Sequence, residues 1–460
     1  MSHTVRRLVH TMRAGNVHAR STGEAGATTV RAMREANRSL ILNYLREHGP
    51  LARVSISRRT GLSRTTVSSI VDALIKEGLV REGSTQNAAR SGGRRAILVH
   101  FNESAGTVLG VDMGRSHLII VATNLAAEVV ARHSGGFDAT QGPEVCLPLL
   151  VAELNRFVER QHLTWDSIVG IGLGIPGPMD ARVRMLISPP RMPGWHGVDV
   201  QRILRRELHV PIYLGNDANM GALGESRFGA GRGIEDFAYV KLGTGIGCGM
   251  VIDGQVYRGS RGTAGELGHV TIEENGPRCD CGNRGCLEAV AAASSIVRDA
   301  VSGTSINRKR ARDGLPPVEG VLARREPDGV DVAEVVQAAL AGDLASQAAI
   351  ERAGELVGIA LASLVNLFNP SVIVVDGSVS RAGDLLLVPI RRAIATRSLS
   401  AASSDIRMIT AELGENAIAL GAVSAVLDAV FHIPVPAGRF MALPESPEPA
   451  EASRAESLPS

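Results

Sequence analysis

The segment HVTIEENGPRCDCGNRGCLE, residues His269–Glu288, places three of the five cysteines of this 460-residue chain within eight residues. Its glycines, proline and asparagines exclude a long regular helix or strand, so a disulfide or a metal must hold the loop. The basic start of the chain lacks the apolar core of a secretory signal, so we expect the thiols to meet a reducing cytosol, where disulfides are rare. The cluster therefore indicates a metal site.

The ligands of this site would be one imidazole and three thiolates. They are His269, Cys279, Cys281 and Cys286. Such a set suits closed tetrahedral zinc, and four protein ligands leave no position for water, so the zinc would be structural. The alternative is a surface loop with three reduced cysteines, and the ligand count argues against it. The other cysteines, Cys146 and Cys248, lie in apolar surroundings and are expected in the core.

Length and composition predict a cytoplasmic protein of two or three domains. Hydrophobic residues make up 44% of the chain, and no run approaches the ~18 apolar residues of a membrane span. We expect residues 1–33 to be a basic, disordered leader and residues 433–460, rich in Pro, Ser and Glu, to be a disordered tail. The charged residues 303–331 are expected to form a mobile insertion.

Charge is distributed unevenly along the chain. Residues 1–100 contain 17 Lys and Arg against 6 Asp and Glu, a net charge of +11, and the remaining residues contain 32 against 41, a net charge of −9. A small basic head on a larger acidic body is typical of a protein whose head meets a polyanion.

The pattern of residues 34–100 predicts a winged helix-turn-helix. A first helix ends at Gly49-Pro50, a second spans about Val54–Thr60, and Ser63 is placed to N-cap a third after the turn Gly61-Leu62. The apolar positions of the first helix are Leu40, Ile41, Tyr44 and Leu45, and those of the third are Val67, Ile70, Val71 and Leu74. Two helices around a short Gly-containing turn place the second one in a DNA major groove.

The outward face of the third helix and the basic loop after it are the expected DNA contacts. The residues are Arg64, Thr65, Thr66 and Ser68 on the helix, and Arg94 and Arg95 on the loop, which returns as a strand and forms the wing. The wing arginines could follow the backbone or enter a minor groove. The alternative, a three-helix packing module with a solvated basic face, does not explain the turn, the cap and the wing together.

After Phe101 the sequence alternates strands and helices, which predicts an α/β fold. Three strands end in glycine loops, at Asp112–Ser116, Gly243–Gly247 and Asp376–Ser378. Such tips let backbone N–H groups approach phosphate oxygens. Asn216-Asp217 lies between a strand and a helix, where it is either a helix N-cap or, through Asp217, a general base for a substrate hydroxyl.

The order of these motifs resembles the ROK family of sugar kinases and sugar-responsive repressors, over about Thr107 to Val430. The motifs in order are DMGRS, GIPGPMD, NDAN, LGTGIG, GELGH, CDCGNRGCLE and VDGS. The resemblance implies a two-lobed actin-like, sugar-kinase fold with the sugar between the lobes, and the winged helix-turn-helix before it is the layout of the repressor branch.

The resemblance also implies site residues. The positions that match the family's sugar contacts are Asn216, Asp217, Glu266, His269 and Glu288. The nucleotide side of a kinase would comprise Asp112, Gly114, Gly243, Thr244, Gly245 and Gly377, with ATP and Mg²⁺ as cofactors. The family's phosphate loop usually has the pattern Asp-x-Gly-Gly-Thr-Lys, and here Arg115 replaces a glycine where the backbone should approach ATP.

These observations predict a sugar-responsive transcriptional regulator, a homodimer or homotetramer that represses carbohydrate-use genes by binding operator DNA. One rival is an ATP-dependent hexose kinase that also binds DNA, with Asp217 as general base. The other is a regulator that senses a partner protein through its body. Arg115 argues against the first rival, and the intact sugar-facing set argues against the second.

Overall fold

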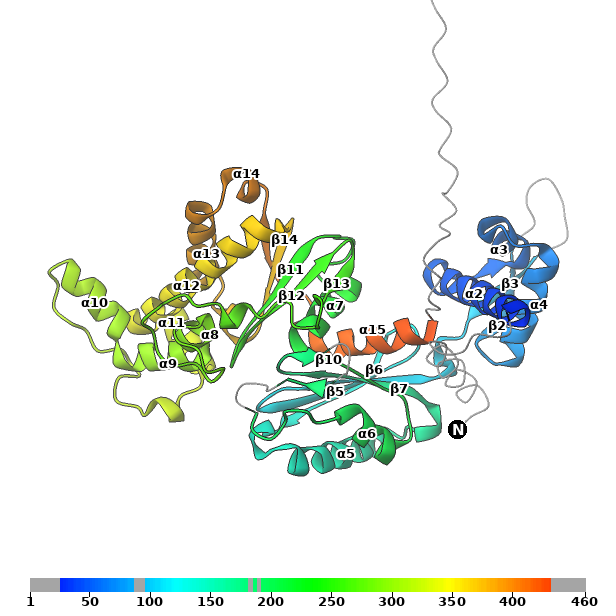
Figure 1. Cartoon of the computed structure of the whole chain (residues 1–460), viewed down its shortest axis with the longest axis horizontal. Helices are drawn as coiled ribbons and strands as arrows, with labels where there is room; N and C mark the ends of the chain where they lie inside the picture. The colour runs from blue at the N-terminus through cyan, green and yellow to red at the C-terminus, as the bar shows by residue number, and fades with distance from the viewer. Residues whose placement is uncertain (1–24, 87–95, 181–184, 188–191, 432–460) are drawn as a thin grey trace, which may run out of the picture.

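The computed structural model describes residues 25–86, 96–180, 185–187 and 192–431. A small head is followed by two lobes, each built on a five-stranded sheet (Figure 1). The start of the expected leader, the tail from residue 433, and the wing arginines Arg94 and Arg95 lie outside the described residues.

The described part of the head has three helices and a small antiparallel sheet of order β1-β3-β2. Its elements are α2 (Ala25–His48), β1 (Leu51–Ala52), α3 (Arg53–Thr60), α4 (Arg64–Lys76), β2 (Val80–Gln86) and β3 (Ala96–Phe101). Gly61 ends α3 in the left-handed region at φ 71°, and the Ser63 side chain accepts a hydrogen bond from Thr66 N, so the predicted turn and cap are confirmed. The first helix begins at Ala25, nine residues before the expected boundary at Arg34.

The core of the head follows the predicted helical spacing with two exceptions, the exposed Leu40 and the half-buried Tyr44. Val67, Ile70, Val71 and Leu74 of α4 are all buried. Ile41 and Leu45 of α2 are buried too, whereas Leu40 is 43% exposed. Leu42 takes the place expected for Leu40, because positions 41, 42 and 45 of the helix face the core that the head shares with α15.

The first lobe carries a mixed sheet of order β10-β7-β4-β5-β6. Its strands are β4 (Thr107–Met113), β5 (His117–Thr123), β6 (Val129–Gly136), β7 (Ile168–Ile175) and β10 (Ile212–Asn216), with the short pair β8 (Met179–Asp180) and β9 (Met185–Leu186) beside it. Helices α5 (Pro143–Arg160) and α6 (Val200–Leu208) cover one face of the sheet, and α15 (Ala417–Phe431) covers the other (Figure 1).

The second lobe repeats this plan with the order β13-β12-β11-β14-β15. Its strands are β11 (Phe237–Leu242), β12 (Ile246–Ile252), β13 (Gln255–Tyr257), β14 (Val372–Asp376) and β15 (Arg407–Thr410). Its helices are α8 (Leu287–Ala291), α9 (Ala293–Ser302), α10 (Thr304–Arg312), α11 (Val332–Leu340), α12 (Leu344–Phe368), α13 (Asp384–Arg397) and α14 (Ser400–Ser403). Together the two lobes confirm the predicted two-lobed α/β architecture.

A pair of helices joins the lobes. Helix α7 (Asp217–Phe228) packs on β11 and β12 of the second sheet and also on α15, which lies on the first sheet. The two helices approach closely at glycines: a Cβ at Gly421 would lie 1.7 Å from the carbonyl oxygen of Met220. Any side chain at that position would force the helices apart, so the contact between the lobes requires glycine there.

Two other expectations differ from the structure. Residues 303–331 are not a structureless loop, because α10 fills Thr304–Arg312 and its Asn307 side chain is hydrogen-bonded to the backbone of Val318. Among the described residues, the segment Gly414–Phe431 is long and apolar enough to cross a membrane, which the sequence reading did not expect. However, 61% of it is buried, as expected of a core helix packed between a sheet and α7.

Candidate functional site

The structure brings the four predicted metal ligands together. One ligand atom from each of His269, Cys279, Cys281 and Cys286 lies within 4.8 Å of all the others. Cys279 Sγ is 3.7 Å from His269 Nδ1, and Cys281 Sγ is 3.7 Å from Cys286 Sγ. These separations match the ~3.8 Å edge of a tetrahedron with Zn–S bonds of about 2.3 Å, and they are far too long for disulfides. The donor set fits a tetrahedral metal.

The loop is shaped to deliver these ligands. Cys279 N donates to Asn283 O at 2.8 Å, which folds the first two thiols into a tight turn, and Leu287 N donates to Val270 O at 2.9 Å, which closes its base. Glu273 pairs with Arg352 of α12 at 2.6 Å and anchors the loop to the second lobe. Gly285, at φ 64°, has no room for a Cβ, which would lie 1.5 Å from Glu273 O.

His269 belongs to the metal cluster and to the cleft at once. Its Nδ1 faces Cys279, whereas its Nε2 lies 4.0 Å from Glu266 Oε2. Burial, followed by the charges of Asp217 and Glu288, raises the pKa of Glu266 to about 7. These effects show that the three carboxyl groups lie near one another, although they come from segments far apart in the sequence.

The remaining residues that were predicted to face a sugar lie at the start of α7 and beside the β11–β12 turn. The Asn216 side chain accepts from Asn219 N at 3.1 Å and donates to Gly177 O at 3.1 Å, so it is a helix N-cap as well as a cleft residue. Glu288 Oε2 accepts from Ile246 N at 3.0 Å and fixes the β11–β12 turn. The five sequence-predicted residues thus line one region, and the helix-cap alternative for Asn216 is also correct.

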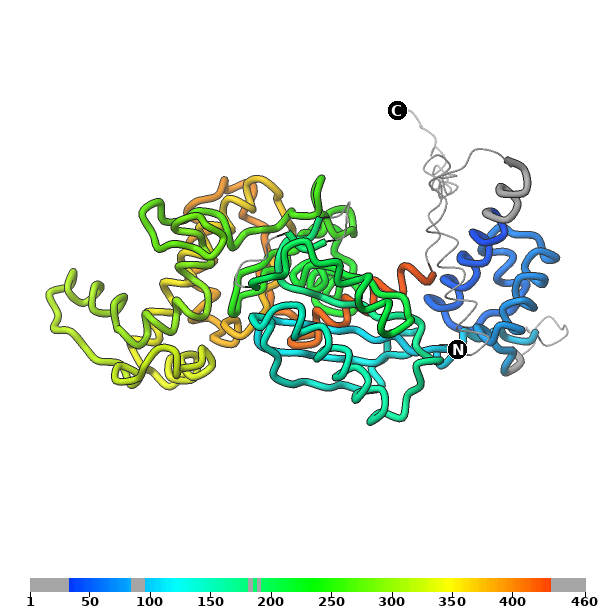
Figure 2. Tube along the Cα trace, turned by 60° about the horizontal axis from the view of Figure 1, so that its bottom comes forward, coloured from blue at the N-terminus to red at the C-terminus, as the bar shows by residue number. Residues whose placement is uncertain are grey.

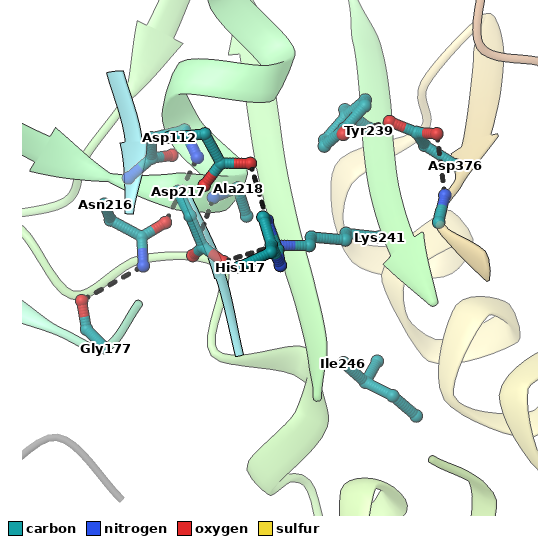
Figure 3. Close-up of polar contacts among 12 residues, drawn as sticks. Asp112, His117, Gly177, Asn216, Asp217, Ala218, Tyr239, Lys241, Ile246 and Asp376 are labelled. Atoms are coloured by element: carbon teal, nitrogen blue, oxygen red, sulfur yellow. Dashed lines mark hydrogen bonds and ion pairs between the residues drawn. The ribbon is translucent and has the colours of Figure 1, made fainter. Parts of the chain in front are cut away.

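Sequence reasoning missed Lys241, which lies on β11 facing the cleft. Its Nζ is 2.9 Å from Asp217 Oδ2, and Asp217 Oδ1 accepts from Ala218 N at 2.9 Å (Figure 3). Burial acts to lower the pKa of Lys241, but the charges of Asp217 and Asp112 outweigh it, so the pKa is raised and the ammonium persists at neutral pH. The rarity of lysine in this chain is the signal that could have found this residue.

The predicted nucleotide loops meet only in part. Gly243 lies next to Ser378, which follows Gly377, so the tips after β11 and β14 are neighbours. Gly245, after Thr244 in the β11–β12 turn, faces the Glu288 carboxylate. In the first lobe His117 covers Gly114, since a Cβ there would lie 2.1 Å from His117 Cε1. His117 Nε2 is 3.1 Å from Asp112 Oδ2.

The head presents the other candidate surface. Arg64, Thr65 and Ser68 line a shallow hollow between α2 and α4 together with Arg34 and Lys76. Thr66 does not line this hollow, and its backbone N–H and its hydroxyl both engage Ser63 in the N-cap. Asp72, on the same face, is neutralised by Arg53 at 2.7 Å. The outward face of α4 is therefore a basic and hydroxyl-bearing surface suited to phosphates and base edges.

Two family models match the chain. One, winged helix-turn-helix DNA-binding, matches residues 34–81, and the other, the ROK family, matches residues 108–429. The xylose repressor of Caldicellulosiruptor bescii is 31% identical over 402 residues, which cover 87% of this chain and 98% of the relative. The N-acetylglucosamine repressor of Escherichia coli O157:H7 is 29% identical over 413 residues, which cover 89% and 97%.

Solved structures agree with these relatives. A ROK family transcriptional regulator, a homologue of the Escherichia coli MLC protein, superimposes with a TM-score of 0.71 at 26% identity, covering 87% of this chain and 97% of that one. A ROK family glucokinase from Streptomyces griseus, solved with glucose and AMPPNP, superimposes with a TM-score of 0.60 at 27% identity, covering 69% and 98%. With its two lobes, its Cys₃His loop and the family match over residues 108–429, the chain belongs to the ROK family.

Proposed function

We propose that this protein is a sugar-responsive transcriptional repressor of carbohydrate-use genes, in which a sugar bound between the lobes relieves operator binding. The observation that carries the proposal is the presence, in one chain, of a helix-turn-helix surface and a cleft that gathers Asp217, Glu266 and Glu288. Similarity to repressors named for xylose and for N-acetylglucosamine over nearly their whole length supports it.

The cleft has the chemistry that a neutral sugar requires. Carboxylates and an amide that are already held by backbone groups accept hydrogen bonds from hydroxyls without first having to be ordered. Structural zinc, held by the four-ligand cluster, would fix the ring of His269 and the start of α8, where Glu288 lies. The metal has no role in the binding step other than this bracing.

A continuous path of contacts links the cleft to the head. Helix α7 begins at Asp217 in the cleft, and near its other end Arg227 pairs with Asp428 of α15 at 3.3 Å. At the end of α15, the backbone oxygen of Phe431 accepts from the Asn43 side chain of the head at 3.2 Å. In both views the last turn of α15 meets the head at α2 (Figures 1 and 2).

The aromatic contact at this junction is well packed. The guanidinium of Arg46 lies 5.0 Å from the centre of the Phe431 ring, and Phe101 meets the same ring edge-on at 5.8 Å. Burial lowers the pKa of Arg46, and the charge of Asp428 opposes that change, so Asp428 is close to the head as well as to α7. Closure of the lobes would move α7 and α15, and through them the head.

The protein would act in the cytoplasm as a homo-oligomer. Relief of repression by reorienting heads requires at least two heads on one operator. The kinase alternative is less well supported, since Arg115 and His117 occupy the phosphate loop. A regulator that senses a partner protein would have no need of the clustered cleft carboxylates.

The test measures the affinity for an operator selected from a random DNA library, with and without each member of a panel of pentoses, hexoses and amino sugars. One sugar is expected to weaken operator binding by about 5–150-fold, the range of typical coupling energies. Glu266→Gln and Asp217→Ala should bind the operator as the wild type does and lose the response. If sugars bind the wild type and none changes its operator affinity, a partner protein becomes the better candidate for the effector.

A further inference from the structure

The cleft contains a lysine in a chain that otherwise uses arginine almost throughout. Of 49 basic residues only three are lysines, namely Lys76, Lys241 and Lys309. Lys76 and Lys309 are exposed, whereas the side chain of Lys241 is only 20% exposed. A lysine offers a compact charge where a planar guanidinium would need more space, so this position calls for a small cation.

That ammonium lies among three carboxylates from separate elements. Asp217 begins α7 and contacts Lys241 directly, Asp112 comes from β4, and Asp376 ends β14; the charges of all three act on the lysine (Figure 3). Three carboxylates converging between two lobes form the type of oxygen-rich site that a hard divalent cation prefers. Here the chain provides its own positive charge at that place.

Most of the carboxylate oxygens that a metal would need are already engaged by the protein. Besides the two bonds to Asp217, Asp376 accepts from Tyr239 Oη at 2.5 Å and from Gly377 N at 2.6 Å. His117 occupies one oxygen of Asp112. Asp112 Oδ1, in a side chain only 3% exposed, is the one of these six oxygens without a hydrogen-bond partner among the described residues. Mg²⁺ demands near-octahedral oxygen ligands, and five of these six carboxylate oxygens already accept a hydrogen bond from the protein, which competes with a metal for them.

The phosphate side of the cleft is closed in the same manner. The imidazole of His117 covers the backbone at Gly114, where a loop must expose its N–H groups to approach a phosphate. The residues present therefore do not fit a metal-bound nucleotide.

We propose that Lys241 is a fixed internal cation that takes the place of a divalent metal in the cleft, so that the cleft holds a neutral sugar and excludes Mg²⁺ and nucleotide. The inference deepens the proposed function and rests on it only for the identity of the ligand. Lys241 is a positioning residue: it holds Asp217 in one orientation and balances its charge, so that the carboxylate receives a hydroxyl and passes no proton onward.

The test uses Mn²⁺ as a probe, added to full-length protein whose zinc content has been measured, with bound Mn²⁺ followed by electron paramagnetic resonance. The wild type and the control Lys309→Met, which removes an exposed lysine paired with Glu351 at 3.5 Å, should bind no Mn²⁺ in the cleft. Lys241→Met should gain one Mn²⁺ per chain, with a Kd at least about tenfold lower than any wild-type binding. Adding Asp112→Asn to Lys241→Met should remove that gain.

Two outcomes would overturn the inference. One is a wild-type protein that binds Mn²⁺ as tightly as Lys241→Met, a measurement that does not depend on any variant folding. The other is Lys241→Arg gaining Mn²⁺ as Lys241→Met does, because the retained positive charge should prevent it. Neither outcome bears on whether sugar alters operator binding, so the proposed function and this inference can fail separately.

Discussion

At the scale of single residues, His269 connects the Cys₃His cluster to the cleft proposed for the sugar. One ring nitrogen faces the thiols and the other faces Glu266, so whatever fixes the ring fixes a hydrogen-bonding group of the cleft. A structural metal would thereby control ligand affinity without touching the ligand.

Cys281→Ser should therefore lose the bound zinc and bind the sugar effector about tenfold or more weakly, because the imidazole is no longer held. Zinc content by mass spectrometry of metals and sugar affinity by calorimetry give the two readouts. Cys146→Ala, which alters a buried thiol on α5 outside the cluster, is the matched control and should retain both. Sugar affinity unchanged in a zinc-free Cys281→Ser protein would show that the metal does not brace the cleft.

The four ligands of the expected metal site could be predicted from the sequence, whereas the role of Lys241 could not. The difference has a physical reason. The ligands lie within one loop, so their spacing alone reports the chemistry. Lys241 matters only because β4, α7 and β14 bring the charges of three aspartates to bear on it, and those aspartates lie between residues 112 and 376. In the sequence, the only sign that this residue is important is that lysine is rare in the chain.

At the scale of elements, α4 presents the residues that should read DNA. Arg64 is exposed at the first position of the helix, where a recognition helix meets base edges. Arg64→Ala should weaken operator binding by about 1–3 kcal/mol if it contacts a guanine edge, with a smaller loss on unrelated DNA. Fluorescence anisotropy on both DNAs is the measurement. Arg206→Ala, at an exposed position of α6 in the body, should change neither.

Helices were predicted well where an apolar stripe and a cap coincide, as in α4, and less well where polar composition dominates. The segment 303–331 was expected to be mobile because it is charged and contains Pro and Gly, yet α10 forms within it. Its neighbour α12 contributes Glu351, which pairs with Lys309 at 3.5 Å, and such tertiary contacts cannot be read from local composition.

The α7–α15 pair should carry the signal from cleft to head. Asp428→Asn removes the charge that Arg227 and Arg46 share, while both partners of the Arg227 pair are partly exposed, so the stability cost should stay within about 1 kcal/mol. Sugar affinity and operator affinity, each measured alone, should remain near wild type, and the effect of sugar on operator affinity should fall. Asp384→Asn, which breaks an exposed pair with Arg391 at the same 3.3 Å, is the control. A full response in Asp428→Asn would place the coupling elsewhere.

At the scale of the whole molecule, operator DNA should be recognised through its charge and the sugar through its uncharged hydrogen-bonding groups. Residues 1–100 carry a net charge of +11 and the remainder −9, so the acidic body should repel DNA and leave contact to the head. The cleft, with its internal cation, should select a ligand without charge. The affinities for operator DNA and for sugar should therefore depend differently on salt concentration.

Operator affinity should fall steeply with salt, whereas sugar affinity should not. Each phosphate neutralised by the head releases counterions, and six to ten such contacts would cost roughly 10³–10⁵ in affinity between about 50 and 200 mM salt. A neutral sugar releases none, so its Kd from calorimetry over the same range should change by less than about twofold. A flat salt dependence of operator binding would contradict the assignment of DNA contact to the basic head. A steep dependence of sugar binding would mean that the effector is anionic, and Lys241 would then be pairing with the ligand rather than with Asp217.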